Sequence, residues 1–143
     1  MALLNARDEA EVRKQLGQMR DSVKLVVFSE TLSGAAELCQ QNEQLVREVA
    51  ALTDKATVET LNLAIDHERA EGYGVDRVPA IVVEGGRDYG IRFYGVPSGY
   101  EFGNLIDSMI VASTGEPALS EETKTALQGL TTDIDIKVFS TPT

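Results

Sequence analysis

The chain contains a single cysteine, Cys39, and this is its clearest candidate for nucleophilic or redox chemistry. A cysteine thiolate attacks disulfides, and a helix N-terminus favours the thiolate by lowering the thiol pKa. Cys39 lies near the start of a long helix predicted over residues 35–52, where a reactive thiol would form a mixed disulfide. Alternatively, it is a small buried residue on the apolar face of that helix, together with Leu38, Val46 and Val49. Helix-dipole activation fades after the first turn, so the sequence favours the buried interpretation.

Other candidates for chemistry are few. One cysteine allows no internal disulfide. The single histidine, His67, lies in the polar run from Asp66 to Arg69, which predicts a solvated helix surface. Acidic residues are spread without metal-ligand spacing, and the glycines at 85–86 and 95–99 do not open a helix after a strand as phosphate loops do. The sequence therefore predicts neither a metal site nor a cofactor.

Composition limits the partners and the location. The 143 residues, 43% of them hydrophobic, suffice for one domain with a real core. The net charge of −10 argues against nucleic acid or an anionic membrane as a partner. No apolar run approaches the roughly 20 residues that span a bilayer. Met1 to Glu11 lacks the apolar core of a signal peptide, so a cytoplasmic location is expected.

The elements that must position Cys39 follow from the spacing of apolar residues. Helices have apolar residues three and four positions apart, and buried strands are continuous and β-branched. The first two strands flank a helix long enough for a right-handed crossover, so they should be parallel, and the last two should form an antiparallel hairpin. This order predicts an α/β fold with strands over 23–28, 57–63, 80–83 and 89–94 and helices over 7–19, 35–52, 66–71 and 100–112.

Two local signals concern the third strand. Pro79 stands directly before the apolar run Ala80 to Val83, and proline, which has no N–H, belongs at the first residue of a strand. A bond between any residue and proline is also the common route to a cis peptide. After the strand, Gly85 and Gly86 predict a tight turn in which glycine supplies the positive φ angles.

Four stretches together carry a resemblance to a known family: residues 23–28 (VKLVVF), 45–55 (LVREVAALTDK), 76–80 (DRVPA) and 90–102 (GIRFYGVPSGYEF). They resemble the N-terminal unit of the tandem thioredoxin-fold, glutaredoxin-like protein disulfide oxidoreductases, and more distantly the N-terminal domain of alkyl hydroperoxide reductase flavoproteins. The resemblance implies a thioredoxin-like fold, with a four-stranded mixed sheet and helices on both faces. It also implies a role in cell redox homeostasis.

The resemblance also implies where chemistry belongs. In that family a Cys-x-x-Cys motif opens the long helix, and its first cysteine attacks while the second resolves. Here the motif is degenerate, because Ala36 occupies the attacking position and Cys39 the resolving one. The resemblance makes the Val78–Pro79 bond cis and places both residues in a substrate-binding groove. Tyr94, Tyr100 and Phe102 are further candidates for that groove, although core packing is favoured for Phe102.

An internal repeat suggests a second unit. Glu122 to Ser140 aligns without gaps with Glu11 to Ser29 at a shift of 111 residues, including a shared Val-Phe-Ser ending. We therefore expect a thioredoxin-like domain at 1–113, followed at 114–143 by a linker, helix and first strand of a truncated second unit. The end, residues 138–143, resembles the run into that unit's Cys-Pro-x-Cys. The strand Ile134 to Phe139 should pair with another copy as a homodimer, or lie disordered.

Three functional hypotheses follow. In the first, this is the redox-degenerate unit of a protein disulfide oxidoreductase, inactive alone, with exchange on protein disulfide or thiol substrates carried by the second unit. In the second, the chain is a non-redox interaction scaffold. In the third, it is a single-cysteine redox enzyme using Cys39. A Cys-x-x-Cys after Thr143 separates the first two, and the exposure of Cys39 tests the third.

Overall fold

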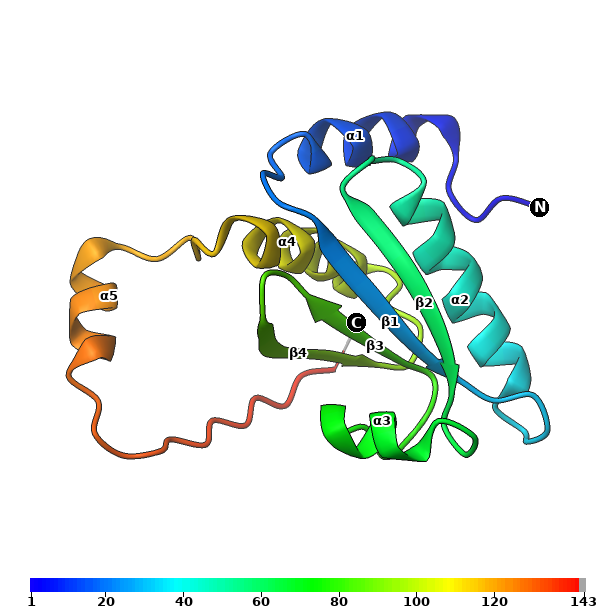
Figure 1. The fold of residues 1–143 in the computed structure, drawn as a ribbon. Helices are drawn as coiled ribbons and strands as arrows, with labels where there is room; N and C mark the ends of the chain where they lie inside the picture. Colours follow the sequence, from blue (N-terminus) through cyan, green and yellow to red (C-terminus); the bar gives the residue numbers. More distant parts are fainter. Residues whose placement is uncertain (142–143) are drawn as a thin grey trace.

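The computed structural model describes residues 1–141; Pro142 and Thr143, the last residues of the predicted second unit, lie outside the described residues (Figure 1). The helices are α1 (Ala6–Leu16), α2 (Ala36–Ala50), α3 (His67–Tyr73), α4 (Tyr100–Thr114) and α5 (Glu121–Gln128). The strands are β1 (Val23–Ser29), β2 (Ala56–Asn62), β3 (Ala80–Glu84) and β4 (Asp88–Tyr94).

The four strands form one mixed sheet in the order β2-β1-β3-β4. β1 pairs in parallel with β2 across the α2 crossover, and it pairs antiparallel with β3 on its other side. β3 and β4 form an antiparallel hairpin. The two predicted pairings, β1 with β2 in parallel and β3 with β4 as an antiparallel hairpin, are confirmed, and the pairing of β1 with β3 was not predicted.

Helices cover both faces of the sheet. Val23, Leu25 and Val27 of β1 belong to a core shared with α1, α2 and α4. The alternate residues Val26 and Phe28 pack toward α3 in a second, smaller core, because successive side chains of a strand point to opposite faces. The predicted thioredoxin-like α/β fold, with helices on both faces of a four-stranded mixed sheet, is confirmed.

Two helix boundaries show how local sequence sets the elements. Asn5 caps α1, its side-chain oxygen accepting the backbone N–H groups of Arg7 and Asp8 at 3.0 Å each. The helix ends at Leu16, so Met19 lies beyond it, although Met19 remains 2% exposed in the core. Gly74, with φ of 67°, ends α3 in the left-handed conformation that glycine favours.

The reason given above for the hairpin glycines is wrong. Neither Gly85 nor Gly86 has a positive φ; in this hairpin Gly90 of β4 does, at 84°. Gly85 is instead required by a close approach, because a β-carbon there would lie 2.0 Å from the carbonyl oxygen of Ala112 in α4. The turn is pressed against a helix backbone, and a side chain has no room.

The predicted strand from Ile134 to Phe139 does not form in the structure. Residues 131–141 have no regular secondary structure and are exposed, with Val138 at 85% and Phe139 at 91%. A strand needs a partner backbone. Here α5 stands away from the sheet and the segment after it turns back toward the sheet (Figure 1), but this segment pairs with no described strand. The helix α5 itself forms as predicted, and Ser120 caps its N-terminus by accepting the N–H of Thr123 at 3.1 Å.

In the described part of the chain, no helix has both the length and the apolar character needed to cross a bilayer.

Candidate functional site

The start of α2 is the position at which the family resemblance places a redox motif, which is expected to be degenerate in this chain. The helix begins at Ala36 after Ala35, whose side chain can form no capping hydrogen bond. The loop before it supplies a substitute, because the Ser33 hydroxyl accepts the N–H of Ala35 at 3.0 Å and the Ser33 carbonyl accepts that of Ala36 at 3.2 Å. The first helical residue, to which the resemblance assigns the attacking position, therefore carries only a methyl group.

Cys39 lies one turn further into α2 and is 1% exposed. Burial raises the pKa of its thiol, and a hydrogen bond from the backbone of Glu30, which acts in the opposite direction, does not offset this. A protonated, buried thiol is a poor nucleophile, because the thiolate is the attacking species.

Asn42 is a feature of the same helix that sequence reasoning missed. It is 0% exposed, and neither its side-chain oxygen nor its side-chain nitrogen has a hydrogen-bond partner in residues 1–141. Its spacing of three residues after Cys39 and four before Val46 was the available signal, since these intervals place it on the buried face. Leu38, which the sequence placed on that face, is instead 49% exposed.

The loop before β3 holds the other predicted site residues. The Val78–Pro79 peptide bond is cis. Pro79 is buried, and its carbonyl accepts the N–H of Gly95 at 2.9 Å, which ties the loop to the end of β4. Val78 is half-buried and packs against the smaller core, and its backbone N–H and carbonyl form no hydrogen bond with any described residue.

The remaining candidate residues lie in different environments. The guanidinium of Arg77 lies 5.4 Å from the ring centroid of Tyr94, which is 42% exposed. Tyr100 is 85% exposed, whereas Phe102 is half-buried and packs on the core, as favoured above. His67 is exposed on α3, with its Nε2 3.5 Å from a carboxylate oxygen of Glu71.

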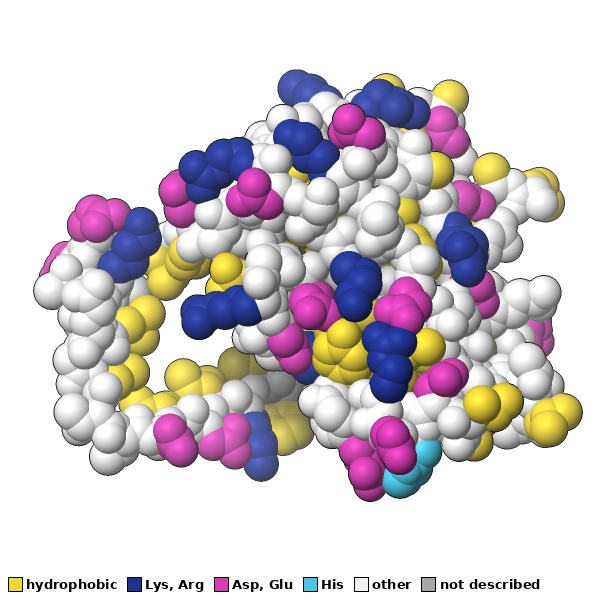
Figure 2. All heavy atoms as spheres, in the orientation of Figure 1, with side chains coloured by type: hydrophobic (Ala, Val, Ile, Leu, Met, Phe, Trp, Pro, Cys, Tyr) yellow, Lys and Arg dark blue, Asp and Glu magenta, His cyan; other side chains and the backbone are white. Residues whose placement is uncertain are grey.

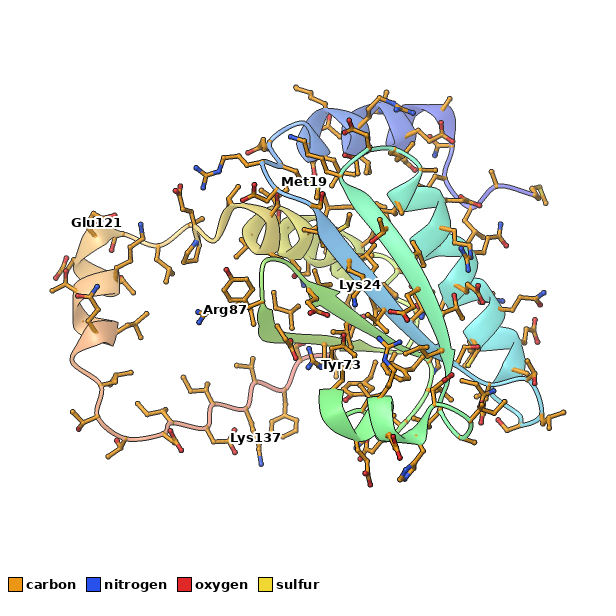
Figure 3. All side chains as sticks on the ribbon, in the orientation of Figure 1. Met19, Lys24, Tyr73, Arg87, Glu121 and Lys137 are labelled. Atoms are coloured by element: carbon orange, nitrogen blue, oxygen red, sulfur yellow. The ribbon has the colours of Figure 1, made fainter. Side chains whose placement is uncertain are left out.

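The face of the sheet beside α3 carries a charged network instead of a reactive group. The ammonium of Lys24 lies 3.8 Å from Glu84 and 3.6 Å from Glu59, and the Tyr73 hydroxyl donates to Glu84 at 2.6 Å. Figure 3 shows Lys24 and Tyr73 on this face, and Figure 2 shows basic and acidic side chains interleaved around hydrophobic atoms there. Because Lys24, Glu59 and Glu84 are paired with opposite charges, we interpret the network as structural and not as catalytic.

Among residues 1–141, no group of three or more His, Cys, Asp or Glu residues is arranged to hold a metal ion. A thioredoxin-like domain with one buried thiol is the class that these features define.

Comparisons with known proteins agree with this fold. No protein-family model matches the chain. A mutant alkylhydroperoxide reductase from Enterococcus faecalis is similar, with a TM-score of 0.78 and 20% identity over 89% of this chain and 61% of that one. A protein disulfide oxidoreductase from Aeropyrum pernix has a TM-score of 0.74 and 22% identity over 91% of this chain and 56% of that one.

A curated relative is longer still. A protein named NADH dehydrogenase from Ferdinandcohnia aciditolerans is 29% identical over 109 residues, which are 76% of this chain and 19% of the relative. The chain thus spans about a fifth of the length of the curated relatives it matches. The resemblance stated from the sequence is confirmed at the level of the fold.

Proposed function

We propose that this chain is a redox-inactive thioredoxin-fold unit of a larger disulfide oxidoreductase. The main support for this proposal is that α2 begins with Ala36, which has no thiol, and that Cys39 is only 1% exposed. A mixed disulfide requires a thiolate that reaches its target. Neither condition is met at Cys39, so the unit contributes structure or partner binding.

The parent's chemistry would reside elsewhere. In thiol–disulfide exchange, a dithiol is oxidised to a disulfide while the substrate disulfide is reduced to two thiols. The names of the similar proteins, an alkylhydroperoxide reductase, a protein disulfide oxidoreductase and an NADH dehydrogenase, favour a parent that moves electrons from NADH to disulfides. The location proposed for it is cytoplasmic.

A second thioredoxin-like unit beginning within residues 114–143 is part of this proposal. The repeat of Glu11 to Ser29 at Glu122 to Ser140 supports it, and α5 corresponds to α1 under the same shift. In the first unit, the equivalent strand β1 is paired on both sides. Ile134 to Phe139 would need the same partners, from the parent or from another copy in a homodimer.

Partner binding, where it occurs in this unit, would use the loop before β3. The unpaired backbone groups of Val78, beside the buried Pro79, are available to an extended peptide from a protein substrate or from the second unit. A purely structural scaffold is the alternative, and a parent without a Cys-x-x-Cys following Thr143 would favour it.

Thiol titration of the native chain tests the proposal. We expect Cys39 to react with a thiol reagent far more slowly in the native chain than in denaturant, because it is buried and its pKa is raised. The matched control is Leu32→Cys with Cys39→Ala, which moves the sole thiol to a site that is 98% exposed. It should label rapidly in both conditions.

Native labelling of Cys39 as fast as that of the control would contradict the proposal. It would favour instead a single-cysteine redox enzyme that uses Cys39 to form a mixed disulfide. Slow native labelling with fast labelling in denaturant excludes that enzyme and supports the inactive unit.

A further inference from the structure

A groove lies on the side of the sheet covered by the larger helices, between α1, α2 and the first half of α4. Its volume is about 900 Å³. Val12, Leu45 and Ile106 form its floor and are 4%, 6% and 1% exposed. This size and apolar lining are typical of binding clefts.

The walls of the groove are held in place. Glu48 of α2 accepts the N–H of Leu3 at 2.8 Å and that of Leu4 at 3.0 Å, which anchors the N-terminal arm as one wall. Partial burial opposes the charge of Glu48, but hydrogen bonds from Gln44 and from these two backbone groups lower its pKa overall. On the opposite side, Phe102 of α4 packs on the core.

The charge at the groove has one sign. Asp8 and Glu11 of α1 are the charged residues among those lining it, and neither forms an ion pair within residues 1–141. Arg7 and Lys14 share a separate, smaller depression with them on α1 and do not line the groove. An apolar floor with an acidic edge is complementary to an apolar partner that carries positive charge.

The conformation of the partner follows from the walls. The lining residues come from helices, the N-terminal arm and the loop after β4, so the groove presents no strand edge. A bound segment must therefore satisfy its own backbone hydrogen bonds, which a helix does. Helices that lay an apolar face into a groove use side chains three and four residues apart.

The geometry points to a docking site for an amphipathic helix of a partner protein, with Leu- or Ile-type side chains on the groove floor and Lys or Arg facing Asp8 and Glu11. A second copy of the chain is disfavoured because both copies carry a net charge of −10. The apolar segment of the chain itself, 134–139, has Lys137 between its apolar residues, but Asp135 pairs with that lysine at 3.5 Å and Asp133 adds a further negative charge beside it, so the segment brings no net positive charge to the groove.

The probe is a synthetic helical peptide with leucine at i, i+3, i+4 and i+7 and lysine on one flank, measured by fluorescence anisotropy. Two control peptides replace lysine by glutamate or leucine by serine. We expect binding by the first peptide alone. We also expect it to weaken as salt is raised, since charges at the groove edge are exposed to screening.

Gly103→Phe locates the site. Gly103 lines the groove on α4, and a β-carbon there meets no atom within 4 Å, so an aromatic side chain adds bulk at the groove without a backbone clash. The matched control is Gly72→Phe in α3, which is equally unobstructed and far from the groove lining. We expect Gly103→Phe to weaken binding at least about tenfold and Gly72→Phe to leave it unchanged.

Charge variants test the partner's chemistry. Glu11→Gln should weaken binding about two- to fivefold, the range of an exposed ion pair, and Asp8→Asn should act similarly. Circular dichroism confirms that each variant is folded.

Several results would overturn the inference: no binding by the lysine peptide, equal binding by the glutamate peptide, or equal affinity in Gly103→Phe and Gly72→Phe. Sedimentation of the chain alone provides a further check. Self-association that Gly103→Phe abolishes would mean that a second copy occupies the groove, which also contradicts the proposed partner.

Discussion

Replacing Gly85 by alanine should destabilise the fold through one defined clash. The added β-carbon would lie 2.0 Å from the carbonyl oxygen of Ala112 and 2.8 Å from its carbonyl carbon. Both are backbone atoms of α4, so neither can rotate away. Real β-carbons essentially never lie closer than 3.0 Å to another heavy atom. The hairpin or the helix must therefore move until the separation of 2.0 Å between the new β-carbon and the Ala112 oxygen has grown to at least 3.0 Å.

The magnitude follows from what that movement disturbs. α4 buries Leu105, Ile106 and Met109 in the larger core at 0%, 1% and 0% exposure. Overpacking of well-packed sites costs about 1–3 kcal/mol, and we expect the upper half of that range because two backbones collide. Gly86→Ala is the matched control, because no atom lies within 4 Å of its β-carbon and its φ is not positive. It should be neutral or stabilising by up to about 1 kcal/mol.

Urea unfolding followed by circular dichroism measures the difference. With a slope of about 1.5 kcal/mol per molar urea, Gly85→Ala should lower the midpoint by about 1–2 M. The slope itself should not change, since the unfolded surface is the same. Midpoints of the two alanine variants within about 0.3 M of each other would refute the close packing of turn and helix.

Two further outcomes are expected. Arg92, 2.6 Å from Asp88, donates a hydrogen bond that lowers the pKa of Asp88 to about 2. The stability that this pair contributes is therefore complete above the ordinary pKa of 3.8 and is lost as the pH falls through 2. NMR titration should show the Asp88 midpoint return toward 3.8 in Arg92→Gln, and an unchanged midpoint would contradict this pairing. Asn42→Leu should raise the free energy of unfolding by about 1 kcal/mol, because it removes a buried amide that has no partner; a lower urea midpoint would show that the amide is satisfied.

Periodicity predicted the helices and strands and their order along the chain, because apolar spacing reports which faces are buried. The length of the crossover helix and the short turn after the third strand predicted two of the three strand pairings. Periodicity failed within α2 for two reasons. Asn42 has the right spacing but a polar side chain, and Leu38 has an apolar side chain but faces the groove beside α1 and α4. A pattern of residue types identifies a buried face only where type and burial agree.

Features that depend on distant segments could not be read from the sequence. The role of Gly85 depends on Ala112, and the groove depends on where α1, α2 and α4 meet. The segment Ile134 to Phe139 shows the converse, in which a local pattern predicts an element that the rest of the described chain does not support. Its alternating sequence favours a strand, but β structure requires a neighbouring backbone, which the described chain does not supply to it.

The salt bridge between Lys24 and Glu84 also constrains how the strands align. These residues face each other directly across β1 and β3. A slip of one residue would turn apolar side chains to the wrong face, but a slip of two preserves the alternation and is harder to exclude. In one direction such a slip would set Lys24 opposite Val82, which is 0% exposed, and would move an ammonium group toward a dry interior at a cost of several kcal/mol. The cost of burying Lys24 in that register is therefore larger than the stability that the Lys24–Glu84 salt bridge adds to the native register.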